Sequence, residues 1–321
     1  MPEARGDDPA GRDWDVIVIG TGMGGGLAGR RLAERGLSVL FLERGPLGPR
    51  GEEHRLDPEM RDPVARRVRG FWPAPIAAEL DGRALELLGT VGAGVGGTSV
   101  FYAASLERPE RHDLEDAAER AHPTGGWPVG HDAFRPHYER AERLLEVCGE
   151  PDPLSEEPAP RLRPAPPASE GDAAMMESFR AAGLNPYRMH LGIRYLPGCR
   201  ECTGHKCPRA CKMDGRSAGV EPALATGRAA LLETCEATAL RGGPGRIDHL
   251  EAVRGGERIR LRARRYLLAG GALGSARLLL ASACEAWPRG CANGSGLVGR
   301  NLMFHLNELV AVWPERPADF T

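Results

Sequence analysis

Residues 15–45 read DVIVIGTGMGGGLAGRRLAERGLSVLFLERG, and this stretch decides the fold. It begins with an apolar, β-branched run that stops at a glycine, as expected of a strand buried on both faces of a parallel sheet. Apolar residues at helical spacing predict a helix over 23–35, and the apolar run 38–45 predicts a second strand. Strand, glycine-rich turn, helix and strand make a βαβ unit, which indicates an α/β protein.

The turn after the first strand fits G-x-G-x-x-G, with glycines at Gly20, Gly22 and Gly25. In dinucleotide-binding folds these glycines allow the tight turn, the approach of a pyrophosphate, and the packing of helix on strand. Glu43 ends the next strand, where an acid can accept both ribose hydroxyls, so FAD or NAD is favoured over NADP. A glycine-rich turn without a cofactor is the alternative. The candidate cofactor-binding residues here are Gly20, Thr21, Gly22, Met23, Gly24, Gly25, Glu43 and Arg44.

Two further glycine clusters favour a flavin over a nicotinamide, because a simple NAD dehydrogenase needs only one such turn. The first is GAGVGGTS at 92–99, which can bring backbone flat against a flavin ring or its phosphates. The second lies in YLLAGGALGSARLLLASA at 266–283, which predicts a strand, a double glycine and a helix. The candidate residues from these clusters are Gly92, Gly97, Thr98, Ser99, Tyr102 and Gly270.

Taken together, these motifs resemble the glucose-methanol-choline (GMC) family of FAD-dependent oxidoreductases. The family's N-terminal fingerprint is matched by 15–45, its first signature in part by GVGGTS at 94–99, and its second by GALGSARLLLAS at 271–282. The family ending VGRNLMxH appears at 298–305, and the likeness covers essentially all of 14–313. The chain departs from the first signature at Ala93 and at the pair Phe101 and Tyr102, where the family often has polar residues.

The resemblance implies a Rossmann-like FAD-binding domain that oxidises a CH–OH group. A base would take the hydroxyl proton while hydride passes from an alcohol, sterol or sugar to flavin N5, and Ala237 would meet adenine through its backbone. The catalytic histidine of the family lies in a C-terminal part that cannot be matched here, so we expect only the N-terminal portion, inactive unless a missing segment or second chain completes it. The catalytic residues are therefore unknown. The alternatives are a non-catalytic FAD-binding protein or, less favoured, an NAD-dependent Rossmann dehydrogenase.

Half of the eight cysteines fall close together in the pattern C-x2-C-x4-C-x3-C, at Cys199, Cys202, Cys207 and Cys211. Four thiolates so close could hold zinc or an iron–sulfur cluster, although the spacing matches neither common zinc ribbons nor usual ferredoxin runs. Some multi-subunit dehydrogenases of the resembled family carry a cluster in this region and pass electrons to a cytochrome partner. Thiols or disulfides that staple a surface loop are the other interpretation.

The composition is that of a globular protein, and the family resemblance implies a small-molecule alcohol substrate. Lys and Arg total 42 against 44 Asp and Glu, a net charge of −2, which argues against nucleic-acid binding. The sequence has neither a secretory signal nor an apolar run long enough for a membrane span, so we expect a cytoplasmic protein. We expect a flexible tail at 1–13, FAD-domain parts at 14–105 and 225–321, and between them an inserted cap or substrate segment, 106–224, with a Pro-rich linker and the cysteines.

Overall fold

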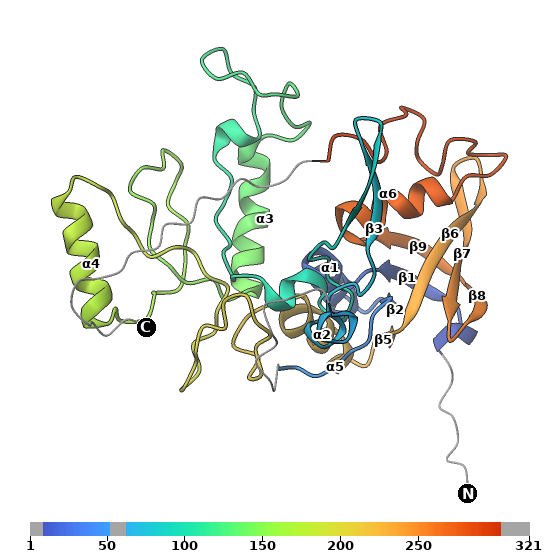
Figure 1. The fold of residues 1–321 in the computed structure, drawn as a ribbon, viewed down its shortest axis with the longest axis horizontal. Coiled ribbons are helices and arrows are strands. Elements are labelled where there is room, and N and C mark those ends of the chain that lie inside the picture. Colours follow the sequence, from blue (N-terminus) through green and yellow to red (C-terminus); the bar gives the residue numbers. More distant parts are fainter. Residues whose placement is uncertain (1–8, 52–61, 303–321) are drawn as a thin grey trace, which may run out of the picture. The chain divides into compact units, whose positions relative to one another are not determined.

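The computed structural model describes residues 9–51 and 62–302 (Figure 1). These residues form two compact units. The first unit contains 9–51, 62–102, 204–209 and 214–302, and the second contains 103–203 and 210–213. In chain order the elements of the first unit are η1 (Pro9–Gly11), β1 (Trp14–Ile19), α1 (Met23–Glu34), β2 (Val39–Leu42), α2 (Pro63–Arg69), β3 (Ile76–Leu80), β4 (Arg83–Leu87), η2 (Gly97–Phe101), the π-helical turn η4 (Gly215–Val220), α5 (Glu221–Ala225), β5 (Ala229–Leu232), β6 (Cys235–Gly243), β7 (Arg246–Arg254), β8 (Glu257–Leu261), β9 (Ala263–Leu268) and α6 (Gly271–Ala281).

A four-stranded sheet in the order β5-β2-β1-β9 forms the centre of the first unit, and all of its pairs are parallel. Ile17 of β1 is opposite Leu40 of β2 on one side and Tyr266 of β9 on the other. The first βαβ unit is therefore β1-α1-β2, as the sequence predicts, and the α/β fold class is confirmed.

Both faces of the parallel sheet are buried, which explains why β1 reads as an unbroken apolar run. Val16 and Val18 pack on the side of α1 and α5 with Ala33, Val220 and Ala223. Ile17 and Ile19, which alternate with them along β1, pack on the opposite side against α6 and the β6-β7-β8 sheet. The core on that side also contains Leu40, Leu250, Leu261 and Leu278. Strand β1 thus contributes to two cores at once.

Two antiparallel sheets complete the first unit. Strands β6, β7 and β8 form one in that order, with a register shift between Ala237 and Ala239 of β6. The hairpin β3–β4 forms the other, and Asp81 and Gly82 between its strands both have positive φ. A two-residue turn of this kind is the usual connection of a tight hairpin.

The second unit contains η3 (Arg111–Asp113), α3 (His131–Leu144) and α4 (Glu170–Ala181) joined by long irregular segments. A buried ion pair holds α3, because Arg108 donates to both carboxylate oxygens of Glu142 at 2.5 and 2.7 Å. Backbone bridges from Cys148 to Arg163 and to Leu191 tie the irregular segments together. Across the ranges that the structure describes, no helix is both long and apolar enough to span a membrane.

Candidate functional site

The first glycine turn is built by close approaches that only glycine permits. Gly20 directly follows β1 and has φ of +102°, and a Cβ there would lie 2.3 Å from the Ala269 carbonyl oxygen. A Cβ on Gly25 would lie 2.1 Å from the Gly20 carbonyl oxygen. Both distances are far below a van der Waals contact, so these two glycines allow α1 to start directly against the ends of β1 and β9.

Gly22 and Gly24 are different, because a Cβ on either would meet no atom within 4 Å. Gly22 caps α1 with an extended backbone and no side-chain hydrogen bond. The first N–H groups of an α-helix have no acceptor within the helix and carry its positive dipole end. The open space over Gly22 and Gly24 thus adjoins a helix terminus suited to phosphate oxygens, which is the fit that a pyrophosphate requires.

The second glycine cluster folds onto this turn. Gly97 has φ of +57°, and a Cβ on it would lie 3.0 Å from the Gly22 Cα, so the two turns meet backbone to backbone. Gly92 donates its N–H to Thr98 Oγ1 at 3.0 Å, and Ser99 Oγ donates to the Gly96 carbonyl at 2.6 Å. The structure therefore brings the predicted residues of both clusters to one place at the carboxyl end of the parallel sheet.

Glu43 is buried and faces the first turn. Its Oε2 accepts from Thr21 N–H at 3.2 Å and from Thr21 Oγ1 at 2.6 Å, and its Oε1 accepts from Gly45 N–H at 3.1 Å. Burial raises the pKa of Glu43 above its usual value, and these hydrogen bonds oppose that rise. Its role toward a ribose stays a prediction, because three of the roughly four acceptor positions of a carboxylate are already used.

The remaining predicted residues lie around the same end of the sheet. Arg44 places its guanidinium carbon 4.1 Å from the centroid of the Trp72 ring, and burial lowers the pKa of Arg44. Ala237 lies on β6, two residues after Cys235, whose N–H donates to the Glu43 carbonyl at 2.9 Å. Gly270 caps α6, and Tyr102 follows η2, half-buried, with its pKa raised by burial.

Gly215 and Gly219 of η4 contribute to the site and are absent from the residues predicted from sequence. A Cβ on Gly215 would lie 2.6 Å from the Gly22 carbonyl carbon, and one on Gly219 would lie 2.4 Å from the Gly26 carbonyl carbon. The backbone of η4 therefore lies directly on the first turns of α1. The available signal was a shared spacing, since Gly215 and Gly219 are four residues apart, as are Gly22 and Gly26.

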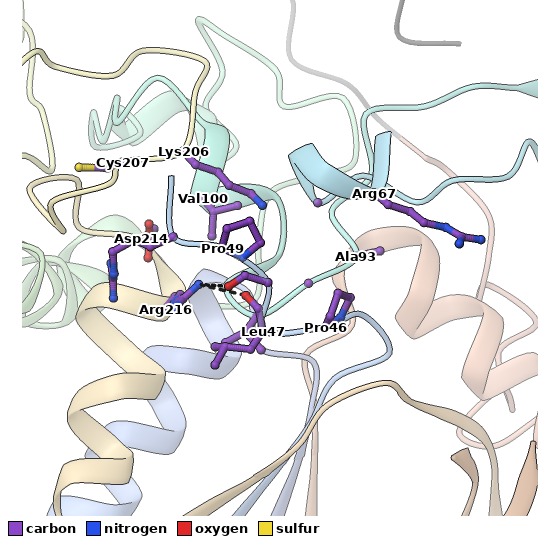
Figure 2. Close-up of a pocket in the computed structure, with 15 residues that line it drawn as sticks. Pro46, Leu47, Pro49, Arg67, Ala93, Val100, Lys206, Cys207, Asp214 and Arg216 are labelled. Atoms are coloured by element: carbon purple, nitrogen blue, oxygen red, sulfur yellow. Dashed lines mark hydrogen bonds between the residues drawn. The ribbon is translucent and has the colours of Figure 1, made fainter. Parts of the chain in front are cut away.

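The loop after β2 is fastened by a residue of η4. Arg216 donates to the carbonyls of Leu47 and Gly48 at 3.0 and 3.3 Å, as the dashed lines in Figure 2 show. The cavity beside these residues, lined also by Lys206 and Asp214, has a free volume of about 20 Å³, enough for about one water molecule. This cavity is far too small for a nucleotide, so its residues support the loop that follows Glu43.

The prediction of an iron–sulfur or zinc site on Cys199, Cys202, Cys207 and Cys211 is not supported. Within residues 9–51 and 62–302, no group of three or more His, Cys, Asp and Glu side chains is arranged to hold a metal ion. The chain is irregular where these cysteines lie: Cys207 and Cys211 are buried, whereas Cys199 and Cys202 are partly exposed. Close spacing along a sequence brings four thiols together only when the segment closes into one loop.

The ending matched at 298–305 is described only as far as Leu302, so its histidine, His305, lies outside the described residues. The structure therefore adds no candidate for a catalytic base from this motif.

Comparison with known proteins identifies the class. The model of the GMC oxidoreductase family matches residues 23–307, and the chain belongs to this family. Paromamine 6'-oxidase of Streptomyces fradiae is 32% identical over 99% of the chain and 58% of its own length. The fructose dehydrogenase large subunit of Gluconobacter japonicus is 28% identical over 91% of the chain and 58% of its own length. The chain thus spans somewhat more than half the length of these relatives.

Solved structures agree on the fold. Pyridoxine 4-oxidase from Mesorbium loti superposes with a TM-score of 0.54 at 20% identity, covering 87% of this chain and 55% of that one. An FAD-dependent oxidoreductase from Chaetomium thermophilum gives a TM-score of 0.56 at 18% identity, covering 84% and 47%. At these identities the likeness concerns the fold alone.

Proposed function

We propose that the protein binds FAD and takes part in the oxidation of a CH–OH group of a sugar-like alcohol. The observation that carries this proposal is the open space over Gly22 and Gly24, where two glycine turns meet at the start of α1. In a family of oxidoreductases, a helix terminus left open in this way is a natural place for the diphosphate of a dinucleotide.

The residues of the site divide by position. Gly22 and Gly24 would lie along the diphosphate, and Gly97, Thr98 and Ser99, which follow in the second turn, would face the flavin side. Arg44 and Ala237 lie beside the end of β2, where the adenosine of a dinucleotide belongs in this type of fold. FAD, when bound, supplies the two-electron chemistry that amino-acid side chains lack.

The substrate class follows from the curated relatives and is part of the proposal. Paromamine 6'-oxidase and 6'''-hydroxyparomomycin C oxidase are named for amino-sugar substrates, and a third relative is named for fructose. We therefore propose a polyhydroxylated, sugar-like alcohol. We also propose that a further segment or a second chain supplies the catalytic base, and that the protein works in the cytoplasm.

The test is anaerobic reduction of the bound flavin. The FAD-loaded chain is mixed with paromamine, with fructose and with an aliphatic alcohol, and bleaching of the visible flavin band is followed. The same assay is run with any segment encoded downstream added. Bleaching by a sugar-like alcohol, in either form, supports the proposal. If flavin binds but no alcohol bleaches it in either form, the protein is a non-catalytic FAD-binding protein and the proposed oxidation is wrong.

A further inference from the structure

A buried hydrogen-bonded junction joins the two glycine turns. Thr21, which lies between the first two glycines of the motif, is fully buried, and Glu43 is 6% exposed. The Thr21 hydroxyl donates to Glu43 Oε2 at 2.6 Å, the short distance expected when the acceptor is a carboxylate. The same hydroxyl accepts the N–H of Gly96, in the second turn, at 3.1 Å.

The direction of each hydrogen bond in this junction is fixed by its partners. Gly96 N–H can only donate, so the Thr21 hydroxyl accepts it with a lone pair and keeps its own proton to donate to the ionised carboxylate. Glu43 also accepts Thr21 N–H on the same oxygen and Gly45 N–H on the other. The carboxylate therefore holds its own loop and the first turn directly, and it reaches the second turn through one hydroxyl group.

Among the described residues, the bond from Gly96 N–H to the Thr21 hydroxyl is the only side-chain hydrogen bond that links 20–25 with 92–99. The neighbouring Gly97 packs against Gly22, since a Cβ on Gly97 would lie 3.0 Å from the Gly22 Cα. We infer that Glu43 is a positioning residue, which acts through Thr21 to hold the second glycine turn against the first; this inference rests on the proposed FAD site. Glu43 then contributes to the shape of the proposed diphosphate site, the open space over Gly22 and Gly24, in addition to any contact with the ribose of adenosine.

The test separates these two roles by the choice of ligand. FMN carries a phosphate but no adenosine. Loss of a contact to the adenosine ribose would therefore weaken the binding of FAD alone, whereas a displaced phosphate site would weaken the binding of both FAD and FMN. The variants are Thr21→Val, which removes the hydroxyl at nearly constant volume, Thr21→Ser, which keeps it, and Glu43→Gln. Thr226→Val is the matched control, because that hydroxyl also donates to a carbonyl, Ala223, at 2.6 Å and accepts an N–H, but lies at the end of α5.

Dissociation constants for FAD and FMN are measured by quenching of flavin fluorescence. We expect Thr21→Val and Glu43→Gln each to weaken both ligands by about tenfold to a hundredfold, the usual effect of losing a hydrogen bond to a charged group. Thr21→Ser should restore binding, and the double variant should bind no worse than either single one. If Glu43→Gln weakens FAD alone and Thr21→Val changes neither ligand, the inference is wrong.

A second measurement does not depend on flavin binding. Hydrogen exchange of the Gly96 amide in the apoprotein should quicken in Thr21→Val and Glu43→Gln but not in Thr21→Ser or Thr226→Val. Should the wild-type chain bind no flavin, the proposed function fails, while this exchange pattern still decides whether the junction exists. An unchanged exchange rate in both Thr21→Val and Glu43→Gln would overturn the inference even if flavin binds.

Discussion

The glycines of the first turn should respond to alanine in opposite ways. At Gly25 a Cβ would lie 2.1 Å from the Gly20 carbonyl oxygen, so α1 and β1 must move apart. Overpacking of this kind costs about 1–3 kcal/mol, and backbone on both sides of the contact leaves little room for adjustment. At Gly22 the methyl group meets no atom within 4 Å and φ is −60°, which alanine adopts readily. The remaining cost is that of alanine at a helix N-cap, about 0.5–1 kcal/mol.

FAD binding should reverse this order of sensitivity. The Gly22→Ala methyl would fill the space proposed for the diphosphate, and we expect FAD affinity to fall more than tenfold while urea unfolding of the apoprotein changes little. Gly25→Ala should lower the urea midpoint clearly. Gly243→Ala is the matched control, because a Cβ there also meets nothing within 4 Å but lies at the end of β6. Unchanged FAD affinity in a folded Gly22→Ala variant would refute the assignment of this space to the cofactor.

Three further predictions concern the polar interior. Replacing the buried Glu142 by Gln leaves the largely buried Arg108 guanidinium with a neutral partner, and we expect the second unit to lose about 3 kcal/mol in urea unfolding. A loss below about 1 kcal/mol would contradict a stabilising role for this ion pair. In the same unit His190 Nδ1 lies 2.7 Å from Glu107 Oε2. Burial alone would lower the pKa of His190, but the Glu107 carboxylate and the Glu150 backbone carbonyl outweigh this effect and raise the pKa above 6.5. The resulting stabilisation is complete below pH 6.5 and is lost as pH rises through the raised pKa, so His190→Gln should flatten the decline in unfolding free energy above that pH, and an unaltered slope would count against the ion pair. Arg66→Met removes hydrogen bonds of 2.9 and 2.5 Å to the carbonyls of Trp72 and Gly89, which lie on either side of hairpin β3–β4. We expect the free energy of unfolding to fall by about 2–4 kcal/mol and proteolysis in the hairpin to become faster. Equal cleavage rates in the variant and the wild type would contradict the role of Arg66 in holding the hairpin.

The sequence was most informative where local pattern and local geometry coincide. An apolar run ending at Gly20, followed by a helical pattern and a second apolar run, predicts β1-α1-β2 because each element is specified by its own residues. The same stretch could not distinguish the glycines whose missing Cβ admits protein backbone, Gly20 and Gly25, from Gly22, whose missing Cβ leaves open space. That distinction depends on neighbours distant in sequence, such as Ala269.

Hairpin β3–β4 and turn η4 were missed for different reasons. The hairpin did carry a signal, the dipeptide Asp81-Gly82 between alternating apolar residues, but charge and proline around it obscured the pattern. Turn η4 became meaningful only through its packing on α1, since a pair of glycines four residues apart has many uses. The metal-site prediction is not supported because spacing alone does not determine the path of an irregular segment, which here buries two of the thiols and leaves two partly exposed.

The direct test of the cofactor site is a titration of the purified, folded apoprotein with FAD and, separately, with NAD. The glycine-lined space at the start of α1 predicts saturable binding of one FAD per chain, with quenched flavin fluorescence and a perturbed visible absorption band. It predicts no comparable binding of NAD. A folded chain that leaves FAD fluorescence and absorbance unchanged, or that prefers NAD, would contradict the assignment of this chain to flavin binding.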